Sequence, residues 1–145
     1  MGLIAALMGG AHTSSYAQGQ TKHPEYLHAL SDLRAARGWL TALGPNNVMG
    51  REMDAVSHID EAIGALKRAS FDDGKNLDQH PPIDAKIRHK GRLHKALALL
   101  EAAHRDITQV EDNDAAKGWR RGAVKHVDDA IKADKQAIKD AKDDA

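Results

Sequence analysis

Histidine is the residue type in this chain best suited to chemistry, because the 145 residues include nine His and no Cys. Imidazole nitrogens bind transition metals and haem iron, and carboxylates often complete such sites. The absence of Cys excludes disulfides, thiolate metal ligands, thiol nucleophiles and covalently attached c-type haem. Metal or haem binding through His and carboxylate side chains is therefore the chemistry to look for.

One candidate metal site draws its residues from the ends and connections of the expected helices. Its four members are His23, Asp72, Asp73 and His80. The start of the first helix, the end of the second and the long connection after it should meet at one end of a bundle. Two imidazoles and two carboxylates suit Zn²⁺ or Cu²⁺. The plainer interpretation is a His before a Pro at a helix start, and an Asp-Asp-Gly helix stop.

Four further His form a second candidate set, with one member on each expected helix. They are His28, His58, His94 and His126. In one slab of a bundle, four imidazoles could hold a transition metal, and two could ligate haem. At 100° per residue, however, they lie roughly 90–150° away from the apolar stripes of their helices. These angles favour positions at helix boundaries or in solvent over a buried metal core.

A catalytic site is not indicated by any motif. Two Glu-x-x-His pairs, Glu25/His28 and Glu101/His104, have the spacing found in di-iron carboxylate bundles. With the first and third helices parallel, they would lie about 15 Å apart along the bundle, too far for one dinuclear site. The chain has no nucleophile elbow, phosphate-binding loop or His-Glu-x-x-His motif. We therefore expect a non-enzyme and assign no catalytic residue.

Four amphipathic segments must position these residues. Apolar side chains recur three and four positions apart, and the few aromatic residues argue against a sheet. The expected helices cover about residues 24–43, 47–72, 82–111 and 114–142. Short turns at Gly44-Pro45 and Glu111–Asp114 force antiparallel neighbours. The expected fold over 23–143 is an all-α, antiparallel, up-down-up-down four-helix bundle made of two pseudo-symmetric helical hairpins.

An internal repeat relates the two expected hairpins. Ser57–Ile63 (SHIDEAI) matches Lys125–Ile131 (KHVDDAI), sixty-eight positions later. A weaker match, sixty-six positions apart, includes His28 and His94. Two copies of this length predict hairpins related by a pseudo-twofold axis rather than a solenoid. Glu52 and Arg120 are equivalent in the repeat, so we expect them at one height, paired across the core.

The N-terminal residues 1–17 contain no charged side chain and include the short apolar run Leu3–Met8. Ser15 and Ala17 are small residues at the −3 and −1 positions of a cleavage site, which indicates a partial signal peptide. The segment lacks a basic beginning, and the alternative is a slightly apolar tail. Residues 18–22 would form a flexible segment. We expect a periplasmic or secreted protein, and the apolar run is too short to span a bilayer.

The charge balance restricts the class of partner. Lys and Arg together number 21, as do Asp and Glu, so the formal net charge is zero. A nucleic-acid partner is therefore not expected, since nucleic-acid-binding proteins carry an excess of basic charge. The expected partner is an unknown protein or a small ligand, and a homodimer is left open.

Three stretches, His23–Arg34, His58–Ile63 and Asp72–Asn76, read HPEYLHALSDLR, HIDEAI and DDGKN. They resemble a group of small exported bacterial four-helix-bundle proteins to which no activity is attached. The resemblance covers about residues 23–140 and implies the bundle, with no activity or cofactor attached to the group. The expected function is that of an exported, non-catalytic bundle with a structural or binding role and no required cofactor. The alternative is His-dependent binding of Zn, Cu or haem, for storage, transport or sensing.

Overall fold

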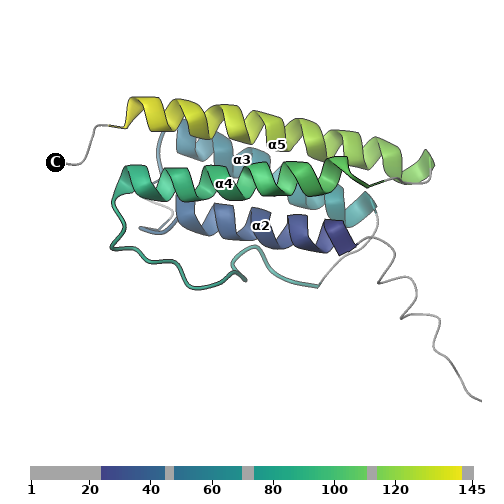
Figure 1. Ribbon diagram of the computed structural model, residues 1–145, viewed down its shortest axis with the longest axis horizontal. Coiled ribbons are helices and arrows are strands. Elements are labelled where there is room, and N and C mark those ends of the chain that lie inside the picture. Colours follow the sequence, from purple (N-terminus) through teal and green to yellow (C-terminus); the bar gives the residue numbers. More distant parts are fainter. Residues whose placement is uncertain (1–23, 45–47, 70–73, 111–113, 142–145) are drawn as a thin grey trace, which may run out of the picture.

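The computed structural model describes residues 24–44, 48–69, 74–110 and 114–141. Within these ranges the chain forms four helices and no strand. The helices are α2 (Pro24–Leu40), α3 (Arg51–Ala69), α4 (His89–Thr108) and α5 (Asp114–Asp140). The predicted all-α four-helix bundle is confirmed (Figure 1). The expected signal peptide and flexible segment, residues 1–17 and 18–22, lie outside the described residues.

Two helices begin later than expected, each for a local reason. Gly50 has a φ of +58°, a left-handed conformation that cannot belong to a right-handed helix, so α3 starts at Arg51. The expected third helix at residue 82 starts at His89 instead. Asp84 accepts a hydrogen bond from the backbone N–H of Lys86 at 2.9 Å, which closes a turn of the type that Asp favours. The residues before His89 therefore belong to the connection.

The connection at residues 74–88 sets the direction of α4. In Figure 1 it returns along the length of the bundle, so that α4 runs parallel to α3. Fifteen extended residues can span about 50 Å, whereas a helix as long as α3 covers only about 30 Å. The helix order is therefore up-down-down-up. The antiparallel packing of neighbours is as expected, but the up-down-up-down order is corrected.

The contacts between helices confirm these directions. The most extensive packing joins α3 to α5 and α2 to α4, with α4–α5 and α2–α3 completing the ring. Arg68, late in α3, lies over the Trp119 ring, early in α5, at 5.2 Å from the ring centroid. Asp32, at the middle of α2, is in the electrostatic field of Arg105 near the end of α4. Each neighbouring pair is thus antiparallel, and the parallel pairs lie on the diagonals.

The pseudo-twofold axis consequently crosses the bundle instead of running along it. The repeat-equivalent helices α3 and α5 are antiparallel, so equivalent residues meet near the axis and separate toward the helix ends. His58 and His126 meet, with ring centroids 5.9 Å apart. Glu52 and Arg120 lie near opposite ends, about 20 Å apart along the bundle. The expected Glu52–Arg120 pair is therefore wrong, and Glu52 contacts His89 on α4 instead.

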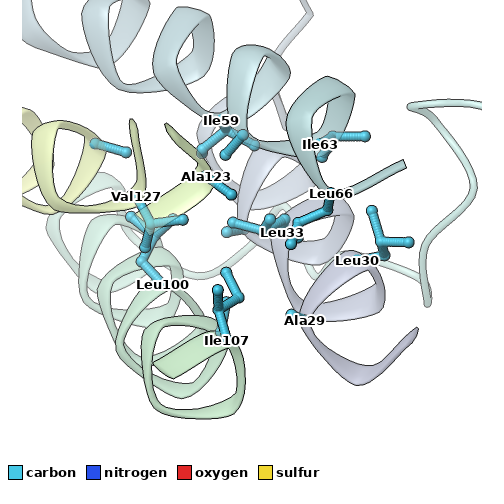
Figure 2. Packing of buried hydrophobic residues seen from close by; sticks show 14 of the residues in the cluster. Ala29, Leu30, Leu33, Ile59, Ile63, Leu66, Leu100, Ile107, Ala123 and Val127 are labelled. Atoms are coloured by element: carbon cyan, nitrogen blue, oxygen red, sulfur yellow. The ribbon is translucent and has the colours of Figure 1, made fainter. Parts of the chain in front are cut away.

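The core is formed by aliphatic side chains from all four helices. Figure 2 shows Leu33, Leu66, Ile107 and Val127 converging from different helices, and all four are fully buried. Many of the remaining core residues are Ala, which let the helix axes approach closely. Within the described residues, no helix combines the length and the apolar character needed to cross a bilayer.

The returning connection is attached to α2 by side chains of that helix. The buried Arg34 donates from Nε to the Gln79 carbonyl at 3.0 Å. Arg37 pairs with Asp78 of the connection at 3.2 Å and with Asp60 of α3 at 2.7 Å. The connection is therefore a packed strap across α2, and its side chains are positioned by that helix.

Candidate functional site

The boundary between α3 and α5 brings two members of the second His set together. The His58 and His126 rings are stacked at 28° to one another with their centroids 5.9 Å apart. Both side chains are partly buried. They are equivalent in the repeat, and the crossing of the two antiparallel helices at the pseudo-twofold axis is what places them side by side.

Carboxylates from the same two helices join this His pair. Asp129 lies one turn after His126, and Glu61 one turn after His58, so each repeat copy carries a His-x-x-carboxylate pair on one face. One donor atom each of His58, His126 and Asp129 lie within 4.8 Å of one another. Glu61 Oε2 lies 2.8 Å from Nδ1 of His126 and 3.8 Å from Nδ1 of His58. Glu61 lies outside that three-residue group but contacts both rings. We call His58, His126, Asp129 and Glu61 the His-carboxylate cluster.

The imidazole nitrogens of this cluster are short of partners. The Nδ1 atoms of His58 and His126 are buried, and neither has a partner in hydrogen-bond geometry, the Glu61 contacts included. Buried polar atoms of this kind are rare in folded proteins and point to an additional partner. The hydrogen bond from Lys125 at 3.0 Å holds the pKa of Asp129 below its ordinary value, so this carboxylate is ionised and able to bind a cation.

The chemistry of the donor set fits a compact metal ion. Two imidazole nitrogens and two carboxylate oxygens form a set that Zn²⁺ accepts in tetrahedral geometry and that Cu²⁺ also accepts. Haem would need imidazoles that point edge-on at the iron from opposite faces of a porphyrin. The stacked rings of His58 and His126 suit that arrangement less well.

The first candidate set is only partly described. His23, Asp72 and Asp73 lie outside the described residues. His80 donates from Nδ1 to the Pro81 carbonyl at 2.8 Å, and its ring packs against Gly38 in the last turns of α2. Gly38 is about 20 Å along the helix from Pro24, so His80 lies away from the end at which α2 begins. Its described contacts are therefore those of the strap with α2.

The other two members of the second set do not join the cluster. His28 and His94 are exposed on α2 and α4, and His28 lies near Asp32, on whose carboxyl its charge acts. Because α2 and α4 are antiparallel, His28 and His104 do lie at similar heights, which corrects the earlier reason for rejecting a di-iron site. His104 instead pairs with Asp128 of α5 at 3.1 Å. Among the described residues, the one metal-compatible group is that of His58, His126 and Asp129.

Sequence reasoning named the two His of the cluster but missed its carboxylates. The signal was present, since both repeat copies carry a carboxylate three positions after the His. What the sequence did not provide was the axis across the bundle, which places the two His-x-x-carboxylate pairs side by side.

A second polar group lies inside the bundle, where α2 ends and α3 and α4 begin. Asp134 of α5 is 0% exposed, and neither of its carboxylate oxygens has a hydrogen-bond partner. Burial and the neighbouring negative charge of Glu52 raise the pKa of Asp134 to about 7. Glu52 is itself largely buried and contacts Nε2 of His89. Glu52 was expected in the core, whereas its contact with His89 was not anticipated.

Comparisons with protein-family models, with curated proteins and with solved structures found no match for this chain. A helical bundle supports many unrelated activities, so the fold alone carries no function. The function is therefore argued from the chemistry of the His-carboxylate cluster.

Proposed function

We propose that this protein is a non-catalytic binder of a divalent transition metal ion, Zn²⁺ or Cu²⁺, held by His58, His126, Asp129 and Glu61. The observation that carries the proposal is the meeting of two equivalent His-x-x-carboxylate pairs across the pseudo-twofold axis. With the export expected from residues 1–17, the bundle would bind its metal outside the cytoplasm, for storage, transport or sensing.

The positions of the ligands support a built site. Each His and its carboxylate lie one helical turn apart, and the helix backbone fixes their relative placement. The two helices belong to different hairpins and share the most extensive packing in the bundle. Ligands on rigid elements lose little conformational freedom when a metal binds, which favours affinity. A bound ion would also join the first hairpin to the second.

The alternative to metal binding is a purely structural role for the two His. In that interpretation the stacked rings and the Glu61–His126 contact only fill the helix boundary. Such a role leaves the two buried Nδ1 atoms unexplained, because nothing in the described structure accepts from or donates to them in good geometry. A metal ion would satisfy the donor atoms of both rings together, after small side-chain rotations.

Calorimetric titration of tag-free protein with Zn²⁺ tests the proposal. We expect one ion per chain, with the affinity lowered by at least about tenfold in His58→Ala and in His126→Ala. His94→Ala is the matched control, because His94 is an exposed His of the second candidate set that lies outside the cluster. Equal losses in all three variants, or no binding by the wild-type chain, would refute the proposal.

A further inference from the structure

A cavity of about 270 Å³ lies at the end of the bundle where α2 ends and α3 and α4 begin. We call it the end cavity. It is lined by Trp39, Leu40, Leu43, Gly44, Glu52, His89, Arg92 and Leu93. The His-carboxylate cluster contributes no residue to this lining, so the end cavity is a separate feature of the molecule.

Charged groups of both signs line the end cavity although they are largely buried. Arg92 is 7% exposed, and the Glu52 side chain is 12% exposed. Burying ionised groups in a small bundle costs stability unless they are paired. Glu52 contacts Nε2 of His89, which also lines the cavity. The Ile87 carbonyl accepts from Nη1 of Arg92 at 2.6 Å. A guanidinium has five N–H donors, so most of its capacity is not used by this bond.

The rest of the lining is apolar. Leu40, Leu43 and Leu93 supply aliphatic surface, and Trp39 supplies an aromatic wall. Leu43 is 55% exposed, a large apolar side chain at the edge of the cavity with much of its surface in water. An aliphatic group placed here would be removed from water, which favours its binding.

From this lining we infer that the end cavity binds a small aliphatic α-amino acid in its zwitterionic form. Arg92 would bind the carboxylate through paired N–H donors, the geometry in which guanidinium recognises carboxylates. Glu52 would accept from the ammonium group, and the leucines would contact the aliphatic side chain. The cavity volume suits a ligand of this size rather than a peptide or a nucleotide.

The state of the neighbouring Asp134 supports an ammonium group at this position. Asp134 is fully buried without a hydrogen-bond partner, and the charge of Glu52 acts on it. The negative charge of Glu52 disfavours ionisation of Asp134, and a bound positive charge would reduce that effect. An organic cation alone would leave the Arg92 donors unused.

Calorimetry with three probes of similar aliphatic shape tests the inference. The probes are L-leucine, 4-methylpentanoate, which lacks the ammonium group, and 3-methylbutylamine, which lacks the carboxylate. We expect leucine to bind at least about tenfold more tightly than either singly charged probe, since each loses one charge-assisted interaction. If either singly charged probe binds as tightly as leucine, or if leucine does not bind, the inference is overturned.

Variants of Arg92 and Glu52 test which charge of the ligand each residue binds. Arg92→Gln should reduce leucine binding toward that of the amine probe, and Glu52→Gln toward that of the acid probe, while Arg92→Lys keeps part of the affinity. Arg105→Gln is the control, as Arg105 lies exposed near the far end of α4. Far-ultraviolet circular dichroism checks that each variant is folded. An unchanged leucine affinity in folded Arg92→Gln would also contradict the inference.

Discussion

Asp134 shows at the scale of one residue how this bundle departs from a purely apolar core. Its carboxyl group is fully buried, unpartnered and close to Glu52 of α3, which in turn contacts His89 of α4. The folded protein therefore holds a proton on Asp134 that an unfolded chain has already lost, because the pKa rises from 3.8 to about 7 on folding. Stability and pH are linked through this group.

We predict that the contribution of Asp134 to stability is fully present below about pH 4 and is lost as the pH rises to about 7. In that window the folded state binds more protons, so the free energy of unfolding falls with rising pH, by on the order of 4 kcal/mol in total. Asp134→Asn should flatten this fall and be more stable than the wild type at pH 8. Urea denaturation of the wild type and of Asp134→Asn at pH 5, 6.5 and 8 measures the free energy of unfolding.

Asp140→Asn provides the comparison for that experiment, because Asp140 is an exposed residue of the same helix. It should keep the pH dependence of the wild type. If Asp134→Asn and Asp140→Asn follow the same curve, the buried carboxyl is not the source of the pH dependence.

The glycines within the helices make a second residue-scale prediction. A Cβ added at Gly64 or Gly122 would meet no atom within 4 Å, whereas one at Gly38 would lie 2.6 Å from Nε2 of His80. Replacing a mid-helix Gly by Ala in open space should stabilise the protein by about 0.5–1 kcal/mol per site. Thermal unfolding of Gly64→Ala and Gly122→Ala should show raised midpoints, and a lowered midpoint in either would contradict the open surroundings.

At the scale of elements, the strap at residues 74–88 is the part that sequence patterns described least well. Helix periodicity predicted where each helix lies, and the four observed helices fall within the expected ranges. The pattern extended the third helix back to residue 82 because Ile83 happened to continue its spacing. Periodicity also carries no information on helix direction, and a connection of this length permits either direction for α4.

The attachment of the strap should depend on the contact between His80 and Gly38. We predict that Gly38→Ala displaces the His80 ring and frees the adjoining segment, because a Cβ and an imidazole nitrogen cannot approach to 2.6 Å. Limited proteolysis should then cut within residues 74–88 faster than in the wild type, while Gly64→Ala should not change that rate. Equal cleavage of the two variants would show that the contact does not hold the strap.

At the scale of the whole molecule, the axis across the bundle is what creates the site. The sequence identified the repeat and, through it, His58 and His126, but the helix angles pointed these residues away from the core. They do lie at a helix boundary, and the partner across that boundary depends on helix order, which the sequence pattern left undetermined. Asp129 and Glu61 could be joined to them only after α3 and α5 were known to be antiparallel neighbours.

A metal at this boundary would cross-link the two hairpins, so its binding should stabilise the entire fold. At a free Zn²⁺ concentration of one hundred times the dissociation constant, we expect the free energy of unfolding to rise by about 2.7 kcal/mol. The thermal midpoint should rise in the wild type and in His94→Ala but not in His126→Ala. A rise of equal size in His126→Ala would place the stabilising ion elsewhere.

Crystallography of the zinc-loaded protein, with an anomalous difference map at the zinc edge, tests the central claim most directly. The proposal predicts one strong peak between α3 and α5, about 2.0–2.1 Å from a nitrogen of His58 and of His126, with Asp129 and Glu61 oxygens completing a tetrahedron. A peak bound elsewhere, or a zinc-loaded crystal in which both rings remain stacked with no ion between them, would contradict it.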